Sequence, residues 1–416
     1  MDIKLLTIQR ELSLLSVFRG LKNTPLIAAL EELLSAIEEG SKSGQGNDSG
    51  MTDCKKRILE SYGAFCSFIY QMGGNLSCAL KDLVLKDENP YLDAVIQNKQ
   101  ISASLSSAAK KELSLFTRIA QLTQTDFREM REMTGYFDDL PLWETSEIDI
   151  EQSFFSMIES VSTNGYGIFA SATVFKTGDD GSLKPIHNTD ILPLSSLYGY
   201  ERERGLVLDN TYALAAGMHA ANVLLYGDAG TGKSSTIKAC AAEYFHLGVR
   251  LIEFKKNQLK FIPALTEQLA GSPLKFIFYI DDLSFRADDD DFCFLKGILE
   301  GDVAGDAANI RIYASSNRRH LIRESFDARI GNDIHLSDTL QETMSLSDRF
   351  GLTVTFSKPE KDLYLSIVEK LAEEYGILMN QDELFLQAEA FAIRTNGRSP
   401  RTAKQFVQSL SVYRIE

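Results

Sequence analysis

The chain has 416 residues, of which 44% are hydrophobic and 24% charged, and its formal net charge is −15. This length is enough for two or three domains. The acidic balance disfavours a general nucleic-acid-binding surface, because it repels phosphate backbones. No apolar run approaches the roughly 18 residues of a membrane-spanning helix, so no membrane partner is expected.

Cysteine usage and the first residues indicate a cytoplasmic protein. The five cysteines are Cys54, Cys66, Cys78, Cys240 and Cys293. Their spacing fits neither a zinc site nor a redox Cys-x-x-Cys pair, and a scattered set is typical of a reducing compartment. The start of the chain, Met1–Lys4, lacks the basic and then apolar layout of a secretory signal.

Residues 1–144 are expected to form a helical N-terminal domain. Apolar residues recur at three- and four-residue spacing in Leu26–Ile37, in Ile58–Ile69 and in Leu113–Met133. Between the first two segments, Gly40–Asp53 is rich in Gly, Ser, Asn and Lys and predicts a flexible loop. The apolar faces are interpreted as a bundle core, and no motif in this region indicates a ligand.

Residues 145–197 predict a linker region with a short hairpin or an extended segment. Ala172–Phe175 and Leu183–Ile186 are strand-like, and Gly178–Gly181 between them is a turn. Pro193 and the Leu-Ser-Ser run that follows it mark the start of the next domain.

Residues 198–357 alternate strand-like and helix-like segments. The strand candidates are Val223–Tyr226, Arg250–Phe254, Phe276–Ile280, Ile310–Ser315 and Leu352–Phe356. Such alternation indicates an α/β fold with a parallel sheet between helices. Ligands of these sheets bind beyond the carboxyl ends of the strands. Residues 358–416 then predict a small helical domain with the segments Asp362–Tyr375, Gln381–Thr395 and Pro400–Arg414.

The most informative segment, residues 227–234, follows the first of these strands and is called the phosphate loop below. It reads Gly-Asp-Ala-Gly-Thr-Gly-Lys-Ser and fits the pattern Gly-x-x-x-x-Gly-Lys-Ser/Thr without departure. A helix-compatible stretch, Ser235–Phe245, follows it. Glycines let the backbone aim N–H groups at phosphate oxygens, and the helix adds its positive end. The expected nucleotide-binding residues here are Gly227, Asp228, Ala229, Gly230, Thr231, Gly232, Lys233, Ser234 and Ser235.

Two acids and an amide follow the next strands and complete a phosphoryl-transfer pattern. Lys233 is expected to reach the β- and γ-phosphates, and Ser234 to bind Mg²⁺. Asp281 would hold the same ion through water, and Asp282 would orient the attacking water. Asn317 can hydrogen-bond the γ-phosphate or that water. Solvated turns are also rich in Asp and Asn, so each signal depends on its pairing with the phosphate loop.

Two arginines are placed to stabilise transferred charge. Arg349 lies in Ser-Asp-Arg-Phe-Gly before the last strand, and Arg401 lies in Ser-Pro-Arg at the start of the last helix. Phosphoryl transfer spreads charge over the γ-oxygens, which arginines stabilise. A helix cap or a surface ion pair is the alternative for each. The crowded residues Arg318, Arg319, Arg323 and Arg329 are interpreted as serving the nucleotide or a neighbouring subunit rather than DNA.

In this order the motifs resemble those of the AAA+ ATPases, over about residues 198–416. The resemblance implies that the phosphate loop is Walker A, that Asp281 and Asp282 form Walker B, and that Asn317 is sensor 1. More narrowly, runs such as Leu-Leu-Tyr-Gly-Asp-x-Gly-Thr-Gly-Lys-Ser-Ser and Ser-Asn-Arg-Arg-His-Leu look like one bacterial group, which has a helical N-terminal region and is known as a domain of unknown function.

The same resemblance assigns the remaining site residues. It implies that Arg349 is an arginine finger that reaches a neighbouring subunit's nucleotide, and that Arg401 is sensor 2 on a helical lid. Tyr198 and Gly199 fall where the adenine pocket of the family begins. The fold implied is a P-loop NTPase sheet with a C-terminal helical lid.

Two departures from the family pattern bear on activity. Asp282 stands where most members place Glu, and its shorter side chain makes slow hydrolysis an open possibility. Lys255–Phe261 lacks the aromatic–apolar–glycine loop of peptide-threading members, which disfavours an unfoldase. The acidic run Asp288–Asp291 is interpreted as a solvated loop that disfavours DNA nearby.

The resemblance implies a protein that binds ATP with Mg²⁺, hydrolyses it, and couples nucleotide state to an unknown protein partner through the N-terminal region. A homo-oligomer is expected, because an arginine acting in trans has no use in a lone subunit. Two alternatives stay open: a nucleic-acid motor or loader of the branch-migration or clamp-loader type, and a nucleotide-gated scaffold with little hydrolysis.

Overall fold

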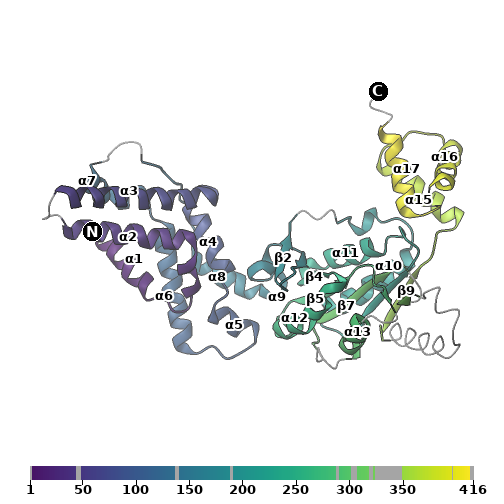
Figure 1. Ribbon diagram of the computed structural model, residues 1–416, viewed down its shortest axis with the longest axis horizontal. Helices are drawn as coiled ribbons and strands as arrows, with labels where there is room; N and C mark the ends of the chain where they lie inside the picture. Colours follow the sequence, from purple (N-terminus) through teal and green to yellow (C-terminus); the bar gives the residue numbers. More distant parts are fainter. Residues whose placement is uncertain are drawn as a thin grey trace. The chain divides into compact units, whose positions relative to one another are not determined.

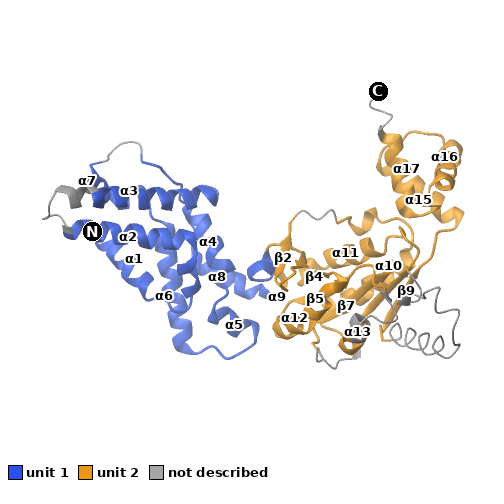
Figure 2. Ribbon diagram, viewed as in Figure 1, with its two compact units in different colours: residues 1–161, 165–170 blue, residues 162–164, 171–416 orange. Residues whose placement is uncertain are grey.

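The structure, a computed structural model, divides the chain into two compact units (Figure 2). Unit 1 contains residues 1–161 and 165–170, and unit 2 contains residues 162–164 and 171–416. The residues described are 2–43, 48–135, 140–187, 191–286, 290–300, 307–317, 322–323, 349–395 and 397–412. Within these ranges, no helix is both long and apolar enough to cross a bilayer. The division into four parts at residues 144, 197 and 357 stays a prediction.

Unit 1 is helical, as the sequence indicated (Figure 1). The helices are α1 (Ile3–Ser13), η1 (Arg19–Asn23), α2 (Pro25–Ser43), α3 (Asp48–Gln71), α4 (Leu76–Lys86), α5 (Pro90–Ile96), α6 (Ala103–Ala120), η2 (Gln124–Phe127), α7 (Arg128–Thr134), α8 (Ile150–Glu159) and η3 (Gly167–Ala170). The short helix α9 (Val161–Asn164) begins at the last residue of the first segment of unit 1, and its other three residues belong to unit 2. Side chains of Asn75, Ser102 and Asp149 cap α4, α6 and α8 by accepting backbone N–H groups. These caps fix where the helices begin.

Aromatic rings fill part of the core of unit 1. Trp143 packs edge-on against Phe65 and Phe127, with ring centroids 5.4 and 5.9 Å apart. Its indole N–H donates to the carbonyl oxygen of Leu122 at 2.8 Å, so the buried polar atom is satisfied. Such pairs stabilise a core beyond their buried area.

The loop expected at Gly40–Asp53 is largely wrong. Helix α2 continues to Ser43 and α3 already begins at Asp48. The two helices pack against each other, and their shared core includes Leu33, Ile37 and Ile58. Tertiary packing of this kind overrides the weak local preference of Gly and Ser for loops.

Unit 2 is built on a seven-stranded sheet in the order β2-β1-β4-β5-β7-β3-β9 (Figure 1). Its strands are β1 (Val174–Thr177), β2 (Leu183–Ile186), β3 (Val223–Gly227), β4 (Val249–Phe254), β5 (Lys275–Ile280), β7 (Ile310–Ser316) and β9 (Leu352–Phe356). All neighbours are parallel except the antiparallel hairpin β1–β2. A separate parallel pair joins β6 (Phe285–Arg286) to β8 (Ile322–Arg323). The five expected strands are therefore confirmed.

Helices cover both faces of the sheet. They are η4 (Leu194–Ser196), α10 (Glu201–Ala215), α11 (Lys233–Glu243), η5 (Phe245–Leu247), η6 (Lys256–Phe261), α12 (Ile262–Leu269) and α13 (Asp290–Glu300). Val223 and Leu225 pack with Val207 of α10 and Ile237 of α11. The alternate residue Leu224 is also buried, and strand alternation places it on the opposite face of the sheet. Strands buried on both sides explain why they read as continuous apolar runs.

Three helices end the chain: α15 (Lys361–Glu374), α16 (Gln381–Arg394) and α17 (Pro400–Val412). Their shared core includes Tyr364, Val368, Ala388 and Val407. The expected C-terminal helical region and the parallel α/β sheet are thus confirmed.

Candidate nucleotide-binding site

The phosphate loop joins β3 to α11, as the motif requires, and its glycines adopt backbone angles that other residues rarely take. The φ angles of Gly227, Gly230 and Gly232 are 139°, 79° and 93°. At Gly227 a Cβ atom would lie 2.0 Å from the carbonyl oxygen of Phe356 on β9. The loop therefore leaves the sheet in contact with the neighbouring strand, which only glycine permits.

Gly227→Ala is expected to lower the free energy of unfolding by about 3–5 kcal/mol, because backbone strain and steric overlap add. Gly232→Ala is the matched control: its φ is also positive, but a Cβ there would meet no atom within 4 Å. Gly232→Ala should lower the free energy of unfolding only by the contribution of backbone strain, about 1–3 kcal/mol. Chemical unfolding followed by fluorescence measures both. Equal losses for the two variants would show that contact with β9 does not restrict the loop.

Lys233 is 5% exposed and lies at the centre of the site. Its ammonium group donates to the carbonyl oxygens of Gly227 and Asp228 at 2.9 and 2.8 Å, and to Oδ1 of Asn317 at 3.0 Å. Burial lowers the pKa of Lys233, although nearby aspartates act in the opposite direction. A buried, charged donor that already bonds three oxygens is suited to receive phosphate oxygens in their place.

Ser234 and Asp281 meet where the motif predicts. The Ser234 hydroxyl donates to Oδ1 of Asp281 at 2.9 Å. The same oxygen also accepts from the Tyr279 and Ser315 hydroxyls, each at 2.6 Å, and from the backbone N–H of Asp282 at 3.1 Å. Burial raises the pKa of Asp281, but these hydrogen bonds outweigh it, so the pKa lies below its ordinary value. The carboxylate is therefore ionised at neutral pH.

Asn317 connects Asp282 to Lys233 through two hydrogen bonds. The amide nitrogen of Asn317 donates to Oδ1 of Asp282 at 2.9 Å, while its oxygen accepts from Lys233. Asp282 has φ of 50°, in the left-handed region that non-glycine residues seldom occupy. Strain of this kind concentrates at functional sites and orients a side chain that the strand direction would not.

The donor set fits a magnesium ion. Mg²⁺ prefers hard oxygen ligands, keeps several waters, and is held by one or two protein groups together with substrate phosphates. A serine hydroxyl and an ionised carboxylate, 2.9 Å apart beside an anion-binding loop, supply that set. Ser234 and Asp281 would hold the ion.

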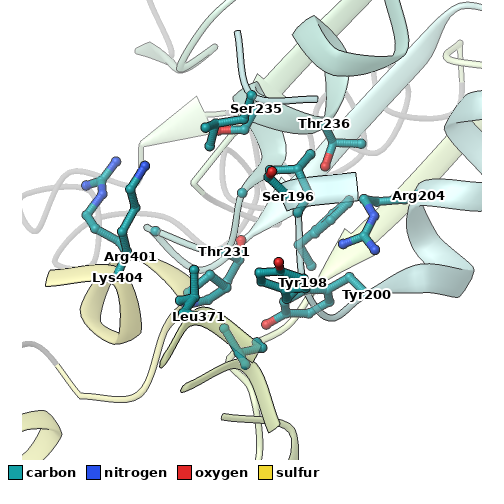
Figure 3. A pocket seen from close by; sticks show the side chains of 17 residues that line it. Ser196, Tyr198, Tyr200, Arg204, Thr231, Ser235, Thr236, Leu371, Arg401 and Lys404 are labelled. Atoms are coloured by element: carbon teal, nitrogen blue, oxygen red, sulfur yellow. The ribbon is translucent and has the colours of Figure 1, made fainter. Parts of the chain in front are cut away.

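A pocket extends from the phosphate loop toward the lid helices (Figure 3). Tyr198, Tyr200, Ile367 and Leu371 give it an apolar part suited to a base. The Tyr200 hydroxyl donates to the carbonyl oxygen of Ser357 at 2.6 Å, and its ring lies 5.3 Å from that of Phe356. Gly199, with φ of 77°, forms the turn between the two tyrosines.

The other side of this pocket is polar. Thr231 and Ser235 of the loop region line it, and so do Arg401 and Lys404 of α17. Figure 3 shows Arg401 and Lys404 side by side, extending from the same helix. The backbone N–H of Arg401 donates to the carbonyl oxygen of Gly230 at 3.2 Å, which brings the start of α17 directly against the phosphate loop.

A second contact ties the loop to the segment before the lid helices. The backbone N–H of Lys358 donates to Oδ2 of Asp228 at 2.8 Å. Asp228 and Ala229 are otherwise exposed. The loop thus contacts the segment before α15 and the start of α17.

Arg349 is the one predicted site residue among those described that lies away from the rest. It precedes β9, whose first residue Leu352 pairs with Val223 at the amino end of β3. The phosphate loop follows the carboxyl end of β3, so Arg349 lies at the opposite edge of the sheet. The residues Arg318, Arg319, Arg329, Asp288 and Asp289, and the side chains of Arg323, Asp290 and Asp291, lie outside what the structure describes.

Sequence reasoning missed several residues of the site. Tyr279 and Ser315 bond Asp281, and Arg204 and Lys404 line the pocket. Tyr279 stands two residues before Asp281, so strand alternation alone places both on one face. Lys404 follows Arg401 by one helical turn, a spacing that also signals a shared face. Arg204 carries no such signal.

The family comparison agrees with the narrower resemblance of the sequence, to a group known as a domain of unknown function. The family model described as "Protein of unknown function (DUF815)" matches residues 169–413. No curated protein sequence matches the chain. Among solved structures, it is similar to the Thermotoga maritima RuvB Holliday junction branch migration motor, at 16% identity and a TM-score of 0.36. That match covers 53% of this chain and 66% of the other.

A proline-to-glycine variant of the same Thermotoga maritima protein matches at 14% identity with a TM-score of 0.37, over 53% of this chain and 67% of that one. The chain thus spans about two thirds of the length of these structures, or slightly less. The family model covers more than half of the 416 residues. The chain therefore belongs to the family described as "Protein of unknown function (DUF815)".

Proposed function

We propose that unit 2 binds ATP with Mg²⁺ and hydrolyses it, as an ATPase of the AAA+ type. The observation that carries the proposal is one continuous hydrogen-bonded chain around the phosphate loop. It runs from the acid Asp282 through Asn317 to Lys233, and Ser234 joins Asp281 beside it. Groups at the ends of two strands, β5 and β7, and on the helix α11 converge there with the charges that a triphosphate and its metal require.

Nucleotide binding follows from the groups on either side of the loop. Phosphate oxygens would accept from the loop N–H groups and from Lys233, which would release the carbonyl oxygens it now bonds. The base would lie in the apolar part of the pocket, between Tyr198 and Leu371. Mg²⁺ bound at Ser234 and Asp281 supplies charge neutralisation on the phosphates.

For hydrolysis, Asp282 and Asn317 would orient a water for in-line attack on the γ-phosphate. Their mutual hydrogen bond of 2.9 Å fixes both side chains, which lowers the entropy lost in reaching the reactive arrangement. Arg401 and Lys404 would add positive charge from the lid as charge spreads over the γ-oxygens.

Coupling to a partner is part of the proposal. Because α17 and Lys358 contact the phosphate loop directly, a bound nucleotide would change how the lid meets the loop. We propose that this change is used in a homo-oligomer, with Arg349 acting on a neighbouring subunit, and that the helical unit 1 recognises a protein partner.

The test uses the full chain. Calorimetry with ATP and Mg²⁺ should show saturable binding, and phosphate release should show turnover. Asp282→Asn should keep the ATP affinity of the wild type and lose turnover at least about 100-fold. Absence of binding heat would overturn the proposal. Unchanged turnover in Asp282→Asn would favour the nucleotide-gated scaffold, and turnover that rises with DNA and falls steeply with salt would favour a nucleic-acid motor.

A further inference from the structure

Two buried hydroxyl groups lie directly beneath Asp281. The Tyr279 and Ser315 side chains are 1% and 2% exposed. Each hydroxyl oxygen lies 2.6 Å from Oδ1 of Asp281, and the two are 3.3 Å from each other. Ser315 also accepts the backbone N–H of Asp282 at 3.2 Å, so it contacts both acids of the site.

Strand alternation and register place these hydroxyls. Tyr279 and Asp281 are two residues apart on and just after β5, so their side chains lie on the same face. Ile280 pairs with Ala314 on β7, which puts the next residue, Ser315, beside Asp281.

All the donors to Asp281 among the described residues converge on one oxygen. Oδ1 accepts four hydrogen bonds, whereas no described residue donates to Oδ2. A carboxylate held in this way cannot rotate freely, and Oδ2 keeps its capacity for a cation or its water. When Ser234 binds the ion itself, its bond to Asp281 is given up, and Tyr279 and Ser315 become the main side-chain groups that fix the carboxylate.

We propose that Tyr279 and Ser315 are positioning residues that hold Asp281 in the orientation required to bind the magnesium ion of the nucleotide complex. This inference rests on the proposed function, since it assumes that Asp281 serves a metal. Groups that orient a metal ligand typically change metal affinity 10–100-fold when removed, because the ligand must then be ordered at the moment of binding.

The experiment measures metal binding rather than activity. Mn²⁺ is titrated into the full chain with a non-hydrolysable ATP analogue, and free Mn²⁺ is followed by electron paramagnetic resonance. Tyr279→Phe and Ser315→Ala should each raise the Kd for Mn²⁺ about 10-fold. Binding of the analogue without metal, measured by calorimetry, should stay within about 2-fold of the wild type, since neither residue lines the nucleotide pocket.

Tyr313→Phe is the matched control. Tyr313 pairs directly with Tyr279 in the sheet, is fully buried, and bonds Asn210 at 2.9 Å and Thr211 at 3.1 Å instead of an acid of the site. Its loss removes a buried hydroxyl from the same sheet face, so it should lower the melting temperature comparably and leave the Kd for Mn²⁺ unchanged.

The outcomes separate this inference from the proposed function. If wild-type protein binds neither analogue nor Mn²⁺, the proposed function fails. If the wild type binds both and Tyr279→Phe and Ser315→Ala bind Mn²⁺ equally well, the positioning role fails. An equal loss of Mn²⁺ affinity in Tyr313→Phe would also overturn it, because the effect would then follow from stability alone. Should Tyr279→Phe fail to fold, Ser315→Ala decides, since it removes a single oxygen atom.

Discussion

Replacing Lys233 with alanine is expected to weaken ATP binding at least about 100-fold and to abolish turnover. The ammonium group is buried and is the only lysine or arginine head group among the described residues shown to bond the phosphate loop carbonyls. A charged hydrogen bond contributes about 1.5–3 kcal/mol, and a phosphate tail would make two with this group. Losing two such hydrogen bonds at the lower value removes about 3 kcal/mol of binding free energy, which corresponds to a factor of more than 100 in Kd. Calorimetry with ATP and Mg²⁺ measures it.

Lys238→Ala provides the control for this variant. Lys238 lies on the same helix, α11, but its ammonium group pairs with Glu253 at 2.6 Å and does not line the nucleotide pocket. It should bind ATP as the wild type does, because a partly exposed ion pair contributes little. Comparable weakening in both variants would mean that general charge, rather than the bonds of Lys233, governs affinity. Wild-type affinity for ATP in Lys233→Ala would contradict the proposal that the phosphate loop and Lys233 bind the nucleotide.

The strands and the phosphate loop were predictable because their signals are local. The five core strands are continuous apolar runs, which a sheet buried on both faces requires, and their observed bounds differ from the expected ones by at most one residue. The loop pattern combines fixed glycines with a lysine and a serine, so the positions of Lys233 and Ser234 follow from the motif. The meeting of Ser234 with Asp281 follows in turn from parallel strands ending at one edge.

Features that depend on register or on distant packing were not predictable. Ser315 reaches Asp281 because of one particular pairing of β5 with β7, which the residues themselves do not encode locally. The hairpin β1–β2 joins the sheet beside β4, although its own residues fitted an extended linker equally well. The left-handed backbone conformation of Asp282 is likewise not indicated by the residues around it. Each of these is a tertiary outcome that competes with weak local preferences.

The position of Arg349 determines what its removal should do. It lies beyond the amino end of β9, while the phosphate loop follows the carboxyl end of the paired strand β3. Five residues of β3 separate the two edges, roughly 16 Å at the usual rise of a strand, which is farther than one side chain reaches. Arg349 is therefore remote from the nucleotide site of its own chain. An arginine placed in this way acts on phosphates only if it projects into the site of a neighbouring copy.

Arg349→Ala is accordingly expected to bind ATP with wild-type affinity and to lose turnover about 1,000-fold, the usual contribution of an arginine supplied in trans. The decisive measurement mixes it with Lys233→Ala. Each variant alone should be inactive, because one lacks the arginine and the other the nucleotide. In a random 1:1 head-to-tail assembly, about a quarter of the interfaces pair an intact nucleotide site with an intact Arg349, so about a quarter of wild-type turnover should return. A mixture as inactive as its components, or full turnover in Arg349→Ala alone, would refute action between subunits.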